Sequence, residues 1–134
     1  MSGYLTTSYF MKKEKDPDAT IIAICRKSLP FIPRIYERMP FFGPSVELLR
    51  QYKAEEMGWE QYREIYKNEQ RAHFKERPDD FRNLLKRARL EKIILCCYEK
   101  TNQEKNNCHR YLLFEILKQI AQKERYNTEF VEEK

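Results

Sequence analysis

The sequence lacks any long hydrophobic run, and this absence narrows the class of protein. Its longest stretch without a charged side chain is Met1 to Met11, whereas a membrane-spanning helix needs roughly 18 or more apolar residues. That stretch has neither the basic start nor the apolar middle of a signal peptide. We therefore expect a cytoplasmic protein with no membrane partner. Its four cysteines are expected to be free thiols, because disulfides persist mainly in oxidising compartments.

The sequence also lacks a concentrated charge of one sign. Lys and Arg number 26 against 21 Asp and Glu, which gives a net charge of +5. Counted in thirds, the basic and acidic residues number 7 and 4, then 11 and 9, then 8 and 8. This diffuse surplus permits an anionic partner such as a nucleotide, but it is not the basic tail typical of many nucleic-acid-binding proteins.

What the chain does contain is enough apolar surface for one core. It has 134 residues, 41% of them hydrophobic, including 18 Phe, Trp and Tyr side chains. This length matches one domain and is too short for two well-packed ones. No repeat or low-complexity segment is present. We expect a single folded domain over residues 1–134.

Runs of β-branched and aromatic residues predict strands at residues 4–10, 20–25 and 92–98, and a further short strand at 126–131. The second run is continuously apolar, which is typical of strands covered on both faces in parallel sheets. The connector at 12–18 is short for a parallel crossover, so the direction of the first strand pair stays open.

Helix signals separate these strands. Ser45 is a suitable N-cap, Gly58 interrupts the helical pattern, Pro78 suits a first helical position, and a last helix is expected after Asn107. The order of elements predicts a small three-layer α/β domain with a mainly parallel sheet of 3–4 strands flanked by helices. The proline-rich residues 27–44 are expected to form a long ordered loop, either a lid over a site or a cover for the core.

Chemistry-bearing residues follow the predicted strands. Ligands of open α/β sheets bind beyond the carboxyl ends of the strands. The side chains expected there are Ser8, Arg26, Cys97, Glu99 and the run Cys108, His109 and Arg110.

The run at 108–110 favours an anion site. With Asn107 as the N-cap, the free amides of the next three residues would attract a phosphate or carboxylate group, and Arg110 and Arg26 would add bidentate donors. We therefore expect binding of a small anionic ligand, such as phosphate or a nucleotide. The alternative is an internal network in which Arg110 pairs with Glu99.

A thiol-dependent enzyme is a second hypothesis for the same residues. A helix N-terminus lowers the pKa of a thiol, so Cys108 would be the nucleophile, with His109 and Glu99 as the other catalytic groups. Helical periodicity weighs against it, because the residue after Cys108 would point about 100° away.

Cys97, Cys108 and His109, with Cys96 or Glu99, are candidate metal ligands. Cys96 and Cys97 face opposite sides of a strand, and the sequence has no C-x-x-C pair. We therefore expect no metal and no other cofactor.

A nucleic-acid-binding accessory protein is a third hypothesis. Arg82, Lys86 and Arg89 share one helical face. The alternative is a solvated face whose cations suit the end of a helix. The oligomeric state stays open.

The closing motifs resemble those of the domain-of-unknown-function 488 family, small bacterial and archaeal proteins. The resemblance lies in a Cys-x-Glu sequence at Cys97 to Glu99 and a Cys-His-Arg sequence at Cys108 to Arg110. Upstream segments that are similar to one branch of the family are 7–10, 24–27, 44–53 and 59–66. The loop between the two motifs, residues 100–107, is longer than the family's usual loop of about five residues.

This resemblance implies a prokaryotic protein with an α/β fold and a mainly parallel sheet. It also implies a shared site at Arg26, Cys97, Glu99 and Cys108 to Arg110. It names no substrate.

Overall fold

The computed structural model describes residues 2–12, 14–26, 36–97 and 108–133. Glu99 and residues 100–107 lie outside these ranges, as does the first half of the proline-rich segment. The elements in chain order are β1 (Tyr4–Tyr9), β2 (Thr20–Ala23), β3 (Glu37–Arg38), the short 3-10 helix η1 (Pro40–Phe42), α1 (Val46–Lys53), α2 (Trp59–Glu76), α3 (Pro78–Arg87), β4 (Lys92–Cys97) and α4 (His109–Glu124).

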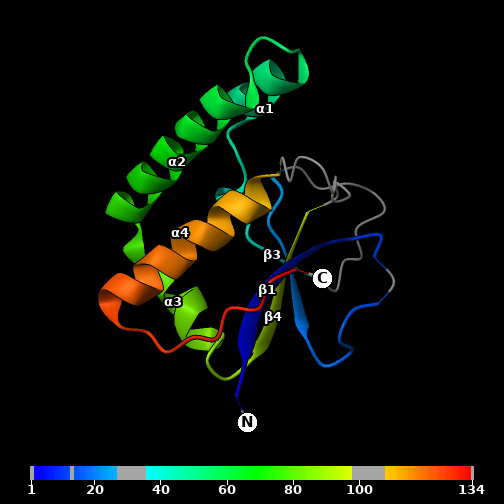
Figure 1. The fold of residues 1–134 in the computed structure, drawn as a ribbon, viewed down its shortest axis with the longest axis vertical. Coiled ribbons are helices and arrows are strands. Elements are labelled where there is room, and N and C mark those ends of the chain that lie inside the picture. The colour runs from blue at the N-terminus through cyan, green and yellow to red at the C-terminus, as the bar shows by residue number, and fades with distance from the viewer. Residues whose placement is uncertain (1, 13, 27–35, 98–107, 134) are drawn as a thin grey trace.

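The four strands form one parallel sheet in the order β1-β4-β2-β3. This parallel sheet with flanking helices confirms the predicted α/β class (Figure 1). The first two strands are parallel but are not neighbours, because β4 lies between them. The short connector between β1 and β2 therefore joins strands that are not adjacent. The direction of this pair, which the spacing left open, is parallel.

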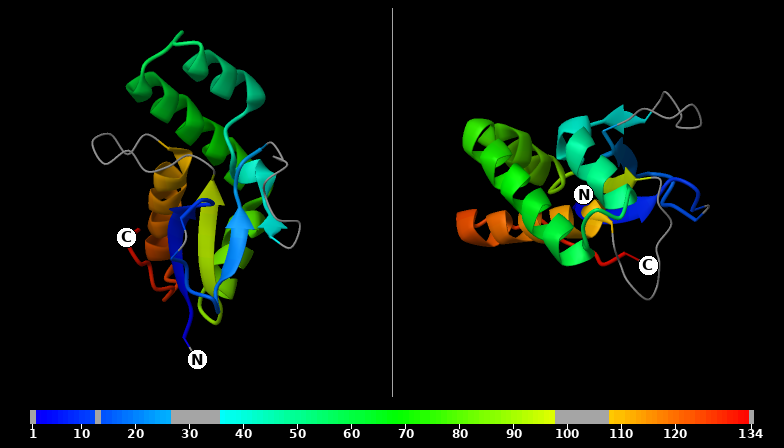
Figure 2. Two further views of the ribbon diagram at one scale, coloured as in Figure 1. Left: turned by 90° about the vertical axis from the view of Figure 1, so that its right-hand side faces the viewer. Right: turned by 90° about the horizontal axis from the view of Figure 1, so that it is seen from above.

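Side-chain alternation divides the sheet into two faces. One face contributes Leu5, Ile22, Ile24, Ile93 and Leu95 to a core shared with the helices. Figure 1 shows the helices gathered on this side. The left view of Figure 2 looks onto the other face, where Ala23 and Cys25 pack against Phe10 and Tyr36 from non-helical segments.

The first three helices begin where the sequence predicts. The Ser45 side chain accepts a hydrogen bond from the Leu48 amide at 3.1 Å, which caps α1. Pro78 opens α3, and two aspartates follow in its first turn, where the helix dipole favours negative charge. Phe81, Leu84 and Leu85 bury one face of α3 in the core.

The proline-rich segment is more regular than a loop over its described part. Glu37–Arg38 forms β3, and Pro40–Phe42 forms η1. Phe42 is fully buried, and its carbonyl accepts a 2.7 Å hydrogen bond from the Tyr66 hydroxyl. This part of the segment therefore covers the core. Residues 27–35 lie outside the described ranges.

The tail follows the edge of the sheet. The strand predicted at 126–131 is reduced to one parallel bridge between Leu5 and Phe130. The Leu5 amide donates to the Glu129 carbonyl at 2.8 Å, and the Val131 amide donates to the Leu5 carbonyl at 2.9 Å. This pairing places the residues after Val131 beside β1.

Among the described residues, none of the helices has both the length and the apolar character needed to span a bilayer.

Gly3 gives a test of how closely β1 approaches the turn before β4. A Cβ at this position would lie 2.2 Å from the Glu91 carbonyl oxygen and 2.4 Å from that of Ala88. These are backbone atoms, so Gly3→Ala is expected to lower the free energy of unfolding by about 1–3 kcal/mol. Gly58→Ala is the control, since a Cβ there meets nothing within 4 Å. Urea denaturation that gives equal midpoints for the two variants would refute this close approach.

Candidate functional site

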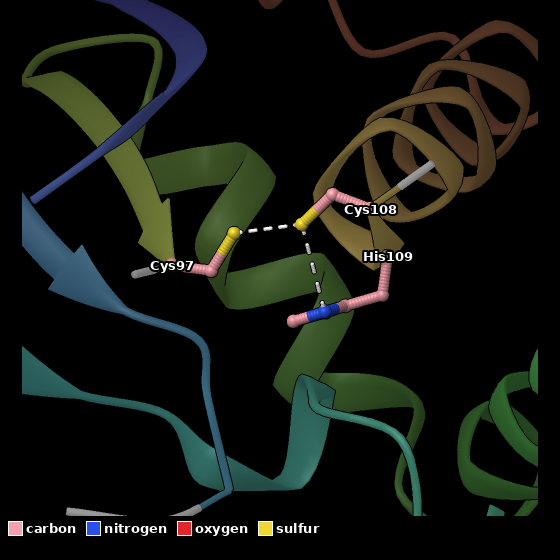
Figure 3. Close-up of side chains that lie close together, drawn as sticks. All are labelled: Cys97, Cys108 and His109. Carbon is pink, nitrogen blue, oxygen red and sulfur yellow. Dashed lines mark hydrogen bonds between the residues drawn. The ribbon is translucent and has the colours of Figure 1, made fainter. Parts of the chain in front are cut away.

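The candidate site lies where β4 ends and α4 begins. Cys97 is the last residue of β4, and Cys108 is the N-cap of α4, directly before His109. Figure 2 shows the tip of β4 and the start of α4 at the same end of the sheet. Three sequence-predicted site residues, Cys97, Cys108 and His109, therefore lie together, as Figure 3 shows.

The two cysteines are in direct contact. Cys97 pairs with Tyr9 in the sheet, and its side chain points to the helix-covered face, two residues after the core residue Leu95. Its Sγ lies 2.8 Å from Cys108 Sγ. Cys96 takes the opposite face, as the sequence predicts for adjacent strand residues. The contact is therefore specific to one of the two neighbouring thiols.

Cys108 has extended backbone, not helical backbone. Its φ of −133° and ψ of 143° make it the N-cap, one residue later than the predicted Asn107. The rule that successive helical residues point about 100° apart therefore does not apply to Cys108 and His109. His109 Nδ1 lies 3.9 Å from Cys108 Sγ, so the sequence-based objection to this pair was wrong.

The orientation of His109 is set by its other nitrogen. Nε2 lies 2.8 Å from the Ile24 carbonyl oxygen. A carbonyl can only accept, so Nε2 carries a proton and donates it. The imidazole ring also packs near the Tyr66 ring, with centroids 5.9 Å apart. These contacts hold Nδ1 toward Cys108.

Arg110 is fully buried and is engaged with protein groups. Its Nε and Nη2 donate to the two carboxylate oxygens of Glu133 at 2.8 and 3.0 Å, and its Nη1 donates to Cys97 Sγ at 3.0 Å. Glu133 also accepts from Thr7 at 2.7 Å and from Tyr111 at 3.0 Å. Arg110 therefore lies in an internal polar network with Glu133, whereas the expected Arg110–Glu99 pair lies outside the described residues.

Two other predicted residues lie apart from this cluster. Arg26 is exposed, and its Nε and Nη2 donate to the carbonyls of Pro44 and Gly43 at 2.8 and 2.9 Å. Ser8 pairs with Cys96, so its side chain faces the other side of the sheet, where its buried hydroxyl has no hydrogen-bond partner among the described residues. Neither residue joins the thiol pair.

The thiols ionise unequally. Burial raises the pKa of Cys97 well above its ordinary value, and the hydrogen bond to Cys108 adds to this. Burial also opposes ionisation of Cys108, but the Cys97 thiol and the charges of His109 and Arg110 outweigh burial and hold the pKa of Cys108 well below its ordinary value. The pair therefore favours one negative charge, on Cys108, with the proton retained by Cys97.

Cys97, Cys108 and His109 could also hold a metal ion, since their ligand atoms lie within 4.8 Å of one another. Among the described residues they are the group with this property. Two thiolates bound tetrahedrally to zinc at about 2.3 Å would hold their sulfurs about 3.8 Å apart. The observed separation is 2.8 Å, so zinc binding would require the two sulfurs to move apart by about 1 Å.

The predicted basic face is partly neutralised. Arg82 forms a two-point ion pair with Glu124 at 2.9 and 3.0 Å, whereas Lys86 and Arg89 are exposed. Tyr62 and Tyr66, which belong to the aromatic series of α2, are buried in the core. These residues therefore do not form an open stacking surface.

Of three comparisons with known proteins, the scan against family models found a match. The search of curated proteins and the search of solved structures each found no match. The family model of the active DUF488-N3 subclade, DUF488-N3a, matches residues 6–121. This match covers most of the chain and agrees with the Cys-x-Glu and Cys-His-Arg resemblance. The chain thus belongs to the DUF488-N3a family.

Proposed function

We propose that this protein is a thiol-dependent enzyme in which Cys108 is the nucleophile. The observation that carries the proposal is the 2.8 Å contact between Cys108 Sγ and Cys97 Sγ at the start of α4. A thiolate is the reactive form of cysteine, and this contact gives the Cys108 thiolate a hydrogen-bond donor.

Three further sources of positive potential support a thiolate at this position. The free amides at the beginning of α4 point toward the N-cap residue, and the helix dipole adds to them. Arg110 reaches the pair through Cys97, and His109 Nδ1 lies 3.9 Å from the nucleophile. Each favours the charged form of Cys108 against the cost of burial.

The residues around Cys108 have distinct proposed roles. Cys97 donates a hydrogen bond to the thiolate. His109 is the nearest group for proton transfer, because its Nε2–H is held by the Ile24 carbonyl and its Nδ1 faces the sulfur. Arg110 and Glu133 position the end of β4 and the start of α4 against each other. The description of the matched family as active agrees with a catalytic role.

The anion site expected from sequence has less support. An external phosphate at Arg110 would have to displace Glu133, which accepts from Nε and Nη2, or Cys97, which accepts from Nη1. Arg26 donates to two backbone carbonyls instead of facing Arg110. Nucleic-acid binding through the α3 face also has less support, because the charge of Arg82 is already neutralised by its ion pair with Glu124.

Alkylation of the native protein with iodoacetamide across a pH series tests the proposal. A lowered pKa keeps Cys108 ionised below the free-cysteine value of about 8.5, so its half-maximal rate is expected at least about one pH unit lower. Peptide mapping by mass spectrometry identifies the labelled residue. The pH midpoint is informative even where restricted access slows alkylation, because poor access lowers the rate at every pH and leaves the midpoint in place.

Matched variants separate the pair from its surroundings. Cys97→Ala removes the thiol donor and is expected to move the Cys108 midpoint upward, whereas Cys96→Ala, on the other face of the same strand, leaves it unchanged. Cys108→Ala removes the low-pH labelling. A Cys108 midpoint at or above that of free cysteine in the wild type would refute the proposal.

A further inference from the structure

The proximity of the two sulfurs has a chemical consequence beyond nucleophilicity. A disulfide bond is about 2.05 Å long, so the observed Sγ–Sγ separation of 2.8 Å leaves less than about 1 Å of closure. Most pairs of free cysteines in a fold lie too far apart for bonding without backbone movement. Here the two sulfurs already face each other (Figure 3).

The backbone around the pair allows this closure at low cost. Cys97 ends a central strand, which is held by β1 and β2 on its two sides. Cys108 is the N-cap of α4 in extended backbone, and its carbonyl accepts a hydrogen bond from the Tyr111 amide at 3.2 Å, so the remaining closure can come from rotation of the Cys108 side chain while this bond stays in place. The approach can therefore come mainly from Cys108.

The other two cysteines do not share this arrangement. Cys96 faces the opposite side of the sheet, and Cys25 packs in the second cluster with Ala23. Burial raises the pKa of Cys96 to about 12, so that thiol stays protonated and unreactive near neutral pH. Cys97 is the thiol whose Sγ contacts Cys108 Sγ, and Cys25 and Cys96 therefore serve as internal controls.

Burial restricts the oxidant that can reach the pair. Cys108 is 6% exposed and Cys97 1% exposed. A hydroperoxide is small and uncharged, whereas a peptide disulfide such as oxidised glutathione is bulky and charged. A small hydroperoxide is therefore the class of oxidant that fits the site.

We propose that Cys97 and Cys108 form a redox couple that reduces a small hydroperoxide and closes to a disulfide, with Cys108 as the attacking sulfur and Cys97 as the resolving sulfur. This inference rests on the proposed nucleophilic role of Cys108 and extends it to a substrate class.

The reaction balances in two steps. The Cys108 thiolate attacks the terminal peroxide oxygen, so an S–O bond forms and the O–O bond breaks; the departing hydroxide, or alkoxide from an organic hydroperoxide, takes up a proton and leaves as water or an alcohol. The Cys97 sulfur then attacks the Cys108 sulfenic acid, the S–S bond forms, and a water molecule leaves. The two sulfurs lose two electrons in total, and the peroxide gains them. An external dithiol reopens the disulfide by exchange.

Treatment of the reduced protein with one equivalent of hydrogen peroxide tests the inference. The intact mass is expected to fall by two hydrogen atoms, and peptide mapping is expected to find one disulfide, between Cys97 and Cys108. Dithiothreitol should restore the starting mass. The same result is expected with Cys25→Ala and Cys96→Ala, whose substitutions lie outside the couple.

Variants of the couple define the order of attack. Cys97→Ala is expected to stop at a Cys108 sulfenic acid that dimedone traps, and Cys108→Ala is expected to form no disulfide. Where Cys97→Ala does not fold, Cys97→Ser replaces it, and the wild-type disulfide map needs no variant at all.

The outcomes separate this inference from the function on which it rests. Low-pH alkylation of Cys108 without any disulfide after peroxide would overturn the redox couple and leave the nucleophile in place. A Cys97–Cys108 disulfide without low-pH alkylation would support the couple and overturn the assignment of Cys108 as an activated nucleophile. Dimedone trapping at Cys97 would overturn the proposed order.

Discussion

Glu133→Ala is expected to lower the free energy of unfolding by about 3–5 kcal/mol, because it leaves a buried charge unpaired. The Arg110 side chain is fully buried and that of Glu133 is 9% exposed, and the two form a two-point ion pair. Removing the carboxylate would strand the guanidinium away from water. Thr7 and Tyr111 would lose the same acceptor.

The neighbouring acid provides the control. The Glu132 side chain is 79% exposed and lies 3.6 Å from Lys118, so Glu132→Ala is expected to change stability by no more than about 0.5 kcal/mol. Urea denaturation measures both variants, and an unchanged slope would show that only stability has moved. Equal midpoints for the two variants would contradict the assignment of a buried, stabilising pair.

A double substitution distinguishes the stranded charge from the value of the pair itself. Replacing a buried ion pair by apolar residues of similar volume is often neutral or stabilising. Arg110→Met combined with Glu133→Leu is therefore expected to recover most of the stability that Glu133→Ala loses. Failure to recover would mean that the hydrogen bonds to Thr7 and Tyr111 outweigh the charge.

The gathering of Cys97, Cys108 and His109 could be predicted because it depends on short-range geometry. Alternation along a strand sends Cys97 to one face and Cys96 to the other, and the observed register agrees. A buried strand followed by a loop and a helix returns the start of that helix to the end of the strand. The local pattern therefore indicated the approach of Cys97 and Cys108, whereas the contact of His109 with Cys108 depends on the extended backbone of Cys108.

The partner of Arg110 could not be predicted in the same way. The contact with Glu133 depends on the tail lying along β1 through the bridge between Leu5 and Phe130. The apolar and β-branched residues near position 130 indicated a strand there, but not which element it would join. The ion pair between Arg110 and Glu133 depends on tertiary contacts, and such a pair produces no periodic pattern in the sequence.

The misplacement of Arg26 has a similar cause. The position follows β2, as predicted, but its surroundings are set by a close backbone approach. A Cβ on Gly43 would lie only 2.8 Å from the Arg26 amide nitrogen, so the chain at Gly43 passes directly against Arg26. This approach brings the carbonyls of Gly43 and Pro44 within reach of the guanidinium. A pattern of residue types contains no record of such an approach.

Phe81→Ala is the other change with a large expected effect, because Phe81 joins α3 to the aromatic centre of the core. Its side chain is fully buried. The ring lies 5.0 Å from that of Phe42, 4.7 Å from that of His73 and 5.3 Å from that of Phe74, between centroids. These neighbours come from η1 and α2, so three elements meet at one ring.

The expected loss is about 3–5 kcal/mol, which combines the transfer free energy of the ring with the cavity that remains. At this chain length the loss corresponds to a fall in Tm of roughly 10–20 °C. The cavity cannot close easily, because Phe42 is also held from the other side by the hydrogen bond that Tyr66 donates to its carbonyl.

Phe41→Ala is the matched control, since it deletes the same side chain at the rim of the same cluster. The Phe41 ring contacts those of Phe42 and His73, but the residue is 36% exposed, so less apolar area leaves water when it folds. Its loss of stability is expected to be clearly smaller than that of Phe81→Ala. Thermal unfolding followed by circular dichroism compares the two, and a loss for Phe41→Ala as large as that for Phe81→Ala would place the centre of the core at η1 instead of at α3.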